Sequence, residues 1–302
     1  MGAPLNKKLL PYFALAAAIL SLTVSAFFVR WADAPAPVFA FYRMGIGGLV
    51  VTPFLIQGGV GRLKLPFKAW ILPVLGGIFT AGDLALWTTG VQKTTIANAT
   101  LLGNTAPVWV VLILWLVFKQ KYPGKFWVGL VLALAGAGIV LGYDFLRRPH
   151  LGSGDAMALV AGMFYAGYYL ATQYGRKHMS VVPYMWLVSL SSAICLLTIS
   201  LVMGYGITGY SLKTTLAFIG AGLVVQGLGY VSIAYALGHL PASIVAPTLI
   251  LQPVFSALLA IPLFGEHLQP VQWIGTAAVL SGVYLVNRSR DSQPGTVVET
   301  NA

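Results

Sequence analysis

Ten apolar runs, each about 20 residues long, follow one another along this 302-residue chain with only short polar gaps between them. A run of that length crosses the hydrocarbon core of a bilayer as a helix. Only 8% of the residues are charged, against about 25% in an ordinary soluble domain, which is too few to cover a water-soluble surface. We therefore predict an all-α polytopic membrane protein with ten transmembrane helices, over Leu10 to Val29, Pro37 to Gln57, Trp70 to Gly90, Ala97 to Phe118, Phe126 to Tyr143, Asp155 to Tyr174, Val182 to Met203, Leu212 to Tyr235, Ser243 to Phe264 and Val271 to Asn287.

The formal charge of +11 indicates membrane topology rather than nucleic-acid binding, because nearly all the basic residues lie in the gaps between apolar runs. Cytoplasmic loops carry the excess of Lys and Arg. The side that holds both termini is much the richer, so we predict cytoplasmic termini and a location in the bacterial inner membrane. This side carries Lys7, Lys8, Arg62, Lys64, Lys68, Lys119, Lys121, Lys125, Arg176, Lys177, Arg288 and Arg290, and the other carries Arg30, Lys93, Arg147, Arg148 and Lys213.

The two halves of the chain repeat one pattern. At an offset of 146 residues the sequence matches itself at Pro107 and Pro253, Trp127 and Trp273, Gly129 and Gly275, and Gly136 and Gly282. Five crossings per copy place the second half upside down, related to the first by a pseudo-two-fold axis in the membrane plane. We predict a cytoplasmic N-terminus (1–9), a first repeat (10–147), a second repeat (148–288) and a disordered cytoplasmic tail (289–302).

Inverted repeats of this kind imply alternating access to a central cavity, since each half can adopt the shape of the other. A duplicated scaffold without a transport role is the alternative. In a transporter of this architecture the solute site lies near the bilayer midplane, at the interface between the repeats.

The stretch from Leu240 to Val286 has small residues before a mid-helix proline, the pair Gly265 and Glu266 at the helix end, and a Gly-rich last helix. In these features it resembles the second repeat of the EamA-type family of the drug/metabolite transporter superfamily. Phe39 to Val50 resembles the second helix of the family with its arginine, and TTIANATLLGNTAPVWVVLIL resembles the fourth. The first repeat departs from the pattern at Lys119 and Gln120, where Gly-Glu is expected. The resemblance implies a ten-helix exporter of small metabolites in the inner membrane, most similar to the aromatic amino-acid exporters.

Two ionisable residues lie clearly at membrane depth, where a charge costs about 2.5 to 3.5 kcal/mol on insertion scales. They are Arg43 in the second predicted helix and Asp83 in the third. Their depths are similar, so they could pair and fix the two helices to one another. Alternatively they face the cavity and receive the carboxylate and ammonium groups of a zwitterion, or Asp83 takes up a proton.

Other candidate residues cluster on the same helices or near prolines that interrupt helices. Thr80, Asp83 and Trp87 share one helix face at spacings of three and four, and Pro107 and Pro253 are expected to break their helices and expose backbone carbonyls. Each polar residue could instead cross-link neighbouring helices, and each aromatic residue could be core. The remaining candidates for substrate contact are Asn98, Asn104, Tyr165, Tyr169, Gln226, Tyr230, Thr248 and Gln252.

The charges select among solutes. A phosphorylated solute calls for several buried cations, and a polycationic one for several buried carboxylates, so a neutral or zwitterionic small molecule remains, plausibly with an aromatic ring. An enzyme is disfavoured because His150, His178, His239 and His267 fall in loops without metal-ligand spacing, and the single Cys195 excludes disulfides. We expect no cofactor, no metal and no nucleic acid, with the bilayer and a small solute as partners of a monomer or weak dimer. A non-transporting receptor remains the rival from another class.

Overall fold

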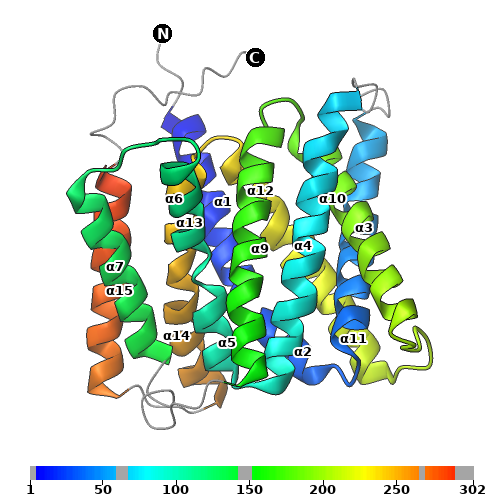
Figure 1. Cartoon of the computed structure of the whole chain (residues 1–302). Helices are drawn as coiled ribbons and strands as arrows, with labels where there is room; N and C mark the ends of the chain where they lie inside the picture. The colour runs from blue at the N-terminus through cyan, green and yellow to red at the C-terminus, as the bar shows by residue number, and fades with distance from the viewer. Residues whose placement is uncertain (1–4, 59–66, 142–151, 265–268, 290–302) are drawn as a thin grey trace.

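The chain forms a bundle of helices that run roughly along one common direction (Figure 1). The computed structural model describes residues 5–58, 67–141, 152–264 and 269–289, and within these ranges all regular secondary structure is helical. In chain order the helices are α1 (Leu5–Thr23), α2 (Ser25–Trp31), α3 (Ala36–Gln57), α4 (Phe67–Lys93), α5 (Ile96–Gly103), α6 (Ala106–Leu116), α7 (Gly124–Leu141), α9 (Ser153–Gly175), α10 (Val181–Val202), α11 (Leu212–Gly220), the π-helix η2 (Ala221–Tyr230), α12 (Val231–Leu237), α13 (Ala242–Thr248), the 3₁₀ turn η3 (Leu249–Leu251), α14 (Gln252–Phe264) and α15 (Pro270–Arg288).

These segments group into the ten predicted helices, which confirms an all-helical membrane architecture. Among the described residues, six helical stretches are long and apolar enough to cross a membrane, and two shorter apolar helices lie at Gly124–Val140 and Ala242–Ser256. The outer surface agrees, since large apolar side chains such as Leu49 and Val202 are 70% and 82% exposed. Such a surface suits lipid rather than water.

In the described parts of the chain, four of the ten helices are not regular from end to end. The first is interrupted at Val24, between α1 and α2, and it begins at Leu5, inside the segment predicted as the N-terminus. The fourth is interrupted between α5 and α6 and the ninth at η3, and the eighth contains the ten-residue π-helix η2. The proline-linked breaks were predicted from sequence; the break at Val24 and the π-helix were not. The predicted repeat boundary at 147, the end of the fifth helix at Tyr143 and nearly all of the predicted tail lie outside the described residues.

The end of α2 and the start of α9 lie at the same end of the bundle. Arg30, in the last turn of α2, donates a hydrogen bond of 2.6 Å from Nη2 to the Thr94 carbonyl oxygen. The Thr94 hydroxyl donates to Asp155 Oδ1, in the first turn of α9, over 2.8 Å. The first helix of the second half therefore begins where the first helix of the first half ends.

Helices α7 and α15 pack backbone against backbone, at one edge of the bundle (Figure 1). A Cβ atom added to Gly136 would lie 2.7 Å from the Gly275 carbonyl oxygen, and one added to Gly129 would lie 2.8 Å from the Gly282 carbonyl oxygen. The sequence match pairs Gly129 with Gly275 and Gly136 with Gly282. The contacts therefore cross over: Gly136 lies against Gly275, the repeat counterpart of Gly129, and Gly129 lies against Gly282, the repeat counterpart of Gly136. The two helices run antiparallel.

The loop after α6 explains how the first repeat tolerates its departure from Gly-Glu. Lys119 has a φ of 56°, the left-handed conformation in which glycine normally ends a helix. The Gln120 backbone N–H closes the turn onto the Leu114 carbonyl oxygen at 3.0 Å, and the Gln120 side chain accepts a bond of 2.9 Å from the Tyr122 hydroxyl. Lysine therefore adopts the backbone shape of the missing glycine at some conformational cost.

We expect Gly136→Ala to destabilise the protein and Gly138→Ala to leave it unchanged or slightly more stable. The new methyl group at position 136 meets backbone atoms of α15 that cannot turn aside, whereas nothing lies within 4 Å of the corresponding position at Gly138. Overpacking of this kind costs about 1 to 3 kcal/mol, while alanine is the better helix former by about 0.5 to 1 kcal/mol. Thermal unfolding in detergent measures both, and equal melting temperatures for the two variants would contradict the packing.

Candidate solute-binding site

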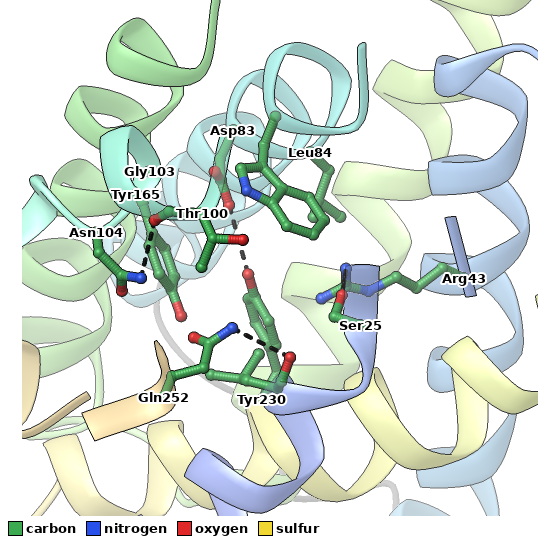
Figure 2. A pocket seen from close by; sticks show the side chains of 12 residues that line it. Ser25, Arg43, Asp83, Leu84, Thr100, Gly103, Asn104, Tyr165, Tyr230 and Gln252 are labelled. Carbon is green, nitrogen blue, oxygen red and sulfur yellow. Dashed lines mark hydrogen bonds between the residues drawn. The ribbon is translucent and has the colours of Figure 1, made fainter. Parts of the chain in front are cut away.

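A cavity lies between α3, α4, α5 and α9, beside the interruption between α1 and α2 (Figure 2). Asp83 and Tyr165 contribute to it from near the middle of α4 and α9. Its volume is about 50 Å³, which is room for several water molecules. Both halves of the chain line it, through Leu22, Ser25, Arg43, Asp83, Leu84, Trp87, Thr100, Gly103, Asn104, Tyr165, Tyr230 and Gln252.

Arg43 brings a guanidinium group to the cavity from the second turn of α3. The residue is 2% exposed, and its Nη1 donates a hydrogen bond of 3.3 Å to Ser25 Oγ, at the start of α2. Within the described ranges, Nε and Nη2 have no hydrogen-bond partner. A buried guanidinium normally has its donors satisfied, but here two of the three nitrogens lack the hydrogen bonds that burial calls for.

Tyr230 stands between the two buried charges. Its ring centroid is 5.0 Å from Arg43 Cζ, within range of a cation–π interaction, and its hydroxyl donates a long bond of 3.4 Å to Asp83 Oδ2. No direct ion pair between Arg43 and Asp83 occurs in the part of the chain that the structure describes. The tyrosine therefore links the two charges and keeps them apart, as Figure 2 shows.

The interrupted helices meet at this cavity. Asn104 ends α5, where its side-chain Nδ2 and its backbone N–H both donate to the Thr100 carbonyl oxygen, over 2.8 Å and 2.9 Å. Gln252 begins α14 and donates from Nε2 to the Leu22 carbonyl oxygen over 3.1 Å. Because α1 ends at Thr23, the Leu22 carbonyl lies in the last turn of that helix and needs a partner outside it. The side chain of one broken helix thus satisfies the backbone of another.

Pro107 and Pro253 both occupy the second position of the helix segment that follows a break, in α6 and α14 respectively. A proline has no N–H to donate and its ring clashes with the carbonyl four residues earlier. The breaks accordingly lie just before the prolines, as the sequence predicted.

Aromatic rings form one wall of the cavity and extend behind it. The rings of Tyr165 and Tyr230 stack at 5.9 Å and 26°, and Tyr169 lies 4.3 Å from Tyr165, centroid to centroid. Tyr168 lies 5.4 Å from Tyr230 and is fully buried. Trp87 packs against Gly103, where an added Cβ would lie 3.0 Å from the indole Cδ1. These faces offer a surface on which a ring could stack.

The structure brings about half of the predicted contact residues into this cavity: Arg43, Asp83, Trp87, Asn104, Tyr165, Tyr230 and Gln252. The other predicted residues do not line it. The Thr80 hydroxyl bonds to the Gly76 carbonyl oxygen at 2.7 Å, Asn98 Nδ2 reaches Thr94 Oγ1 at 3.5 Å, and Tyr169 is buried behind Tyr165.

Thr248 and Gln226 also lie away from the cavity lining. The Thr248 hydroxyl donates to the Ile244 carbonyl oxygen and accepts a bond of 3.1 Å from Asn287 Nδ2, so it cross-links α13 to α15. Gln226 is 1% exposed, and neither its Nε2 nor its Oε1 has a hydrogen-bond partner among the described residues.

Sequence reasoning missed Ser25 and Leu22 as parts of the site. No proline marks the interruption between α1 and α2, and the signal available was a cluster of small polar residues, Ser21, Thr23 and Ser25, inside an apolar run. Thr100 and Gly103 stood beside predicted residues of the fourth helix, and Leu84 carries no polar group that would single it out.

Comparison with known proteins decides the class of this molecule. The EamA-like transporter family matches residues 9–142 and, a second time, residues 152–288. The chain belongs to the EamA-like transporter family. It is accordingly a multi-pass membrane transporter.

Relatives of this EamA-like transporter cover most of its length. It is 29% identical over 259 residues to the uncharacterized transporter YwfM of Bacillus subtilis, covering 84% of this chain and 85% of that one. It is 28% identical over 232 residues to the pseudopaline exporter CntI of Pseudomonas aeruginosa, with coverage of 75% and 77%. A crystal structure with 17% sequence identity superposes with a TM-score of 0.76, over 94% of this chain and 98% of that one, and shows the same fold.

We expect the double variant Arg43→Gln/Asp83→Asn to lose less stability than the losses of the two single variants added together. Each single change leaves one buried charge without its counterpart across Tyr230, whereas the double change removes both. Residues in one network show coupling on the order of 1 kcal/mol. Thermal unfolding of the four proteins in detergent measures the coupling, and additive effects would contradict an energetic link through Tyr230.

Proposed function

We propose that this EamA-like transporter exports small neutral or zwitterionic metabolites, aromatic amino acids and related compounds above all, across the bacterial inner membrane by alternating access. The observation that carries the proposal is the cavity, which both halves of the chain line and which holds one cation, one anion and aromatic faces. The carboxylate and ammonium groups of an amino acid match the two charges, and its ring matches the faces of Tyr165 and Trp87.

Alternating access requires that the two halves be inverted copies of one unit, over residues 10–147 and 148–288. Three observations support this. The family matches each half separately, and α9 begins at the end of the bundle where α2 ends. The crossed glycine contacts of α7 and α15 are those that a two-fold axis perpendicular to both helices produces, since that axis exchanges Gly129 with Gly275 and Gly136 with Gly282.

Two other functions compete with this one. A different solute of the same superfamily is the nearer alternative, and the relative named as a pseudopaline exporter supports export without fixing the solute. A non-transporting receptor would bind solute in the same cavity and move none of it.

Purified protein in liposomes should take up labelled tryptophan or phenylalanine faster than empty liposomes do, and a panel of unlabelled solutes should compete according to their likeness to these amino acids. If only unrelated solutes inhibit the flux, aromatic amino acids are not the substrate. Solute binding without any flux would favour the receptor.

Single cysteines at the ends of the first helix of each half should lie on opposite sides of the membrane. In a Cys195→Ala background, we expect Asp33→Cys to react with a membrane-impermeant thiol reagent from the periplasm and His178→Cys to react only after the cells are opened. Both native side chains are exposed. Labelling of both from one side would contradict the inverted repeat.

A further inference from the structure

The guanidinium of Arg43 has one edge in use and one edge free. Ser25 accepts from Nη1, whereas Nε and Nη2 have no partner within the described residues although the side chain is almost wholly buried. These two nitrogens lie on the same side of the planar group and present parallel N–H bonds. The spacing of such an edge fits the two oxygens of one carboxylate.

Asp83 is a carboxylate nearby, but it does not occupy that edge. Tyr230 lies over the guanidinium with its ring and bonds Asp83 with its hydroxyl. The arginine is therefore held in place on one side and left without an anion on the other. Among the residues that line the cavity, Arg43 is the cation and Asp83 the anion, so a solute carboxylate has a single place to bind.

We propose that the Nε and Nη2 edge of Arg43 binds the carboxylate of the transported solute, that Ser25 positions the guanidinium for this contact, and that the Tyr230 ring moves aside when the solute enters. The inference rests on the proposed function and narrows it, because a solute must then carry a carboxylate. Once the Tyr230 hydroxyl has moved away from Asp83, the Asp83 carboxylate faces the ammonium group of an amino acid. A decarboxylated amine of the same shape lacks the group that the arginine recognises.

A purely structural role for Arg43 is the competing explanation. In that case the cation–π contact with Tyr230 and the bond to Ser25 would only hold α3 against η2 and α2. Such a role predicts that loss of the arginine weakens transport of every solute alike, whatever its charged groups.

Transport of a matched pair of solutes separates the two roles. Tryptophan and tryptamine differ by the carboxylate alone, and Arg43→Lys keeps the charge while losing the two-pronged edge. We expect wild type to prefer tryptophan, and Arg43→Lys to raise the KM for tryptophan about tenfold or more while the KM for tryptamine stays within about twofold. The control is Arg288→Lys, the same change at an exposed arginine whose side chain, among the described residues, donates a hydrogen bond to Tyr284 of its own helix. Equal losses for both solutes would overturn the proposal.

The KM and kcat of Ser25 variants test whether this residue positions the guanidinium. We expect Ser25→Ala to raise the KM for tryptophan with little change in kcat, and Ser25→Thr, which keeps a hydroxyl, to restore the KM. A fall in kcat for both solutes in Ser25→Ala, without rescue by threonine, would show that the residue serves the helix junction only.

A binding measurement separates this inference from transport itself. Wild type and Arg43→Lys in detergent are heated with tryptophan, with phenylacetate, which has a carboxylate and no amine, or with tryptamine. We expect tryptophan and phenylacetate to raise the melting temperature of wild type and not that of a folded Arg43→Lys. Stabilisation without flux would contradict the proposed function and leave the carboxylate subsite standing. Failure of both carboxylates to stabilise wild type would overturn the subsite, whatever the flux.

Discussion

A helix that is interrupted inside a bilayer leaves backbone groups that lipid cannot satisfy, and this constraint explains where the site lies. Within the described residues, the interruptions at Val24, between α5 and α6, and at η3 occur in helices that reach the cavity. Side chains near the breaks bond to the backbone there. Gln252 supplies a partner for the Leu22 carbonyl, and the Asn104 side chain adds a second bond to the Thr100 carbonyl, which already accepts from the Asn104 backbone N–H. Polar residues are needed there for the backbone, and the same residues make the cavity polar.

The two buried charges, Arg43 and Asp83, are kept apart by Tyr230. A guanidinium and a carboxylate that met directly would neutralise one another and leave little for a solute to bind. Tyr230 prevents this with an apolar ring and a weak donor, contacts that a solute can replace with a ring and charges of its own. The tyrosine lies at the end of the ten-residue π-helix η2, and π-helical insertions into α-helices are frequent at functional sites.

The sequence predicted the helices well because each span is an apolar run of the length that a bilayer demands. It also singled out Arg43 and Asp83, since an ionisable residue at membrane depth is costly and needs a specific role. It could not place Ser25 or the break at Val24, because no proline marks them, nor the π-helix, whose residues are as apolar as their neighbours. The hydroxyls of Thr248 and Thr80 donate to carbonyls of their own helices, as threonine hydroxyls often do in membranes, and neither residue lines the cavity. Which face of a helix lies toward the cavity depends on its packing against helices far away in the sequence, and the pattern within one helix does not contain that information.

The glycine contacts between α7 and α15 bear on how such a molecule would move. The exchange of shape that we propose between inverted halves would map this pair of helices onto itself, so its spacing would be the same before and after the exchange. Because the backbones come into close contact at these glycines, the pair has little freedom to slide. It would serve as a stationary spine at the rim of the bundle, against which the helices around the cavity swing.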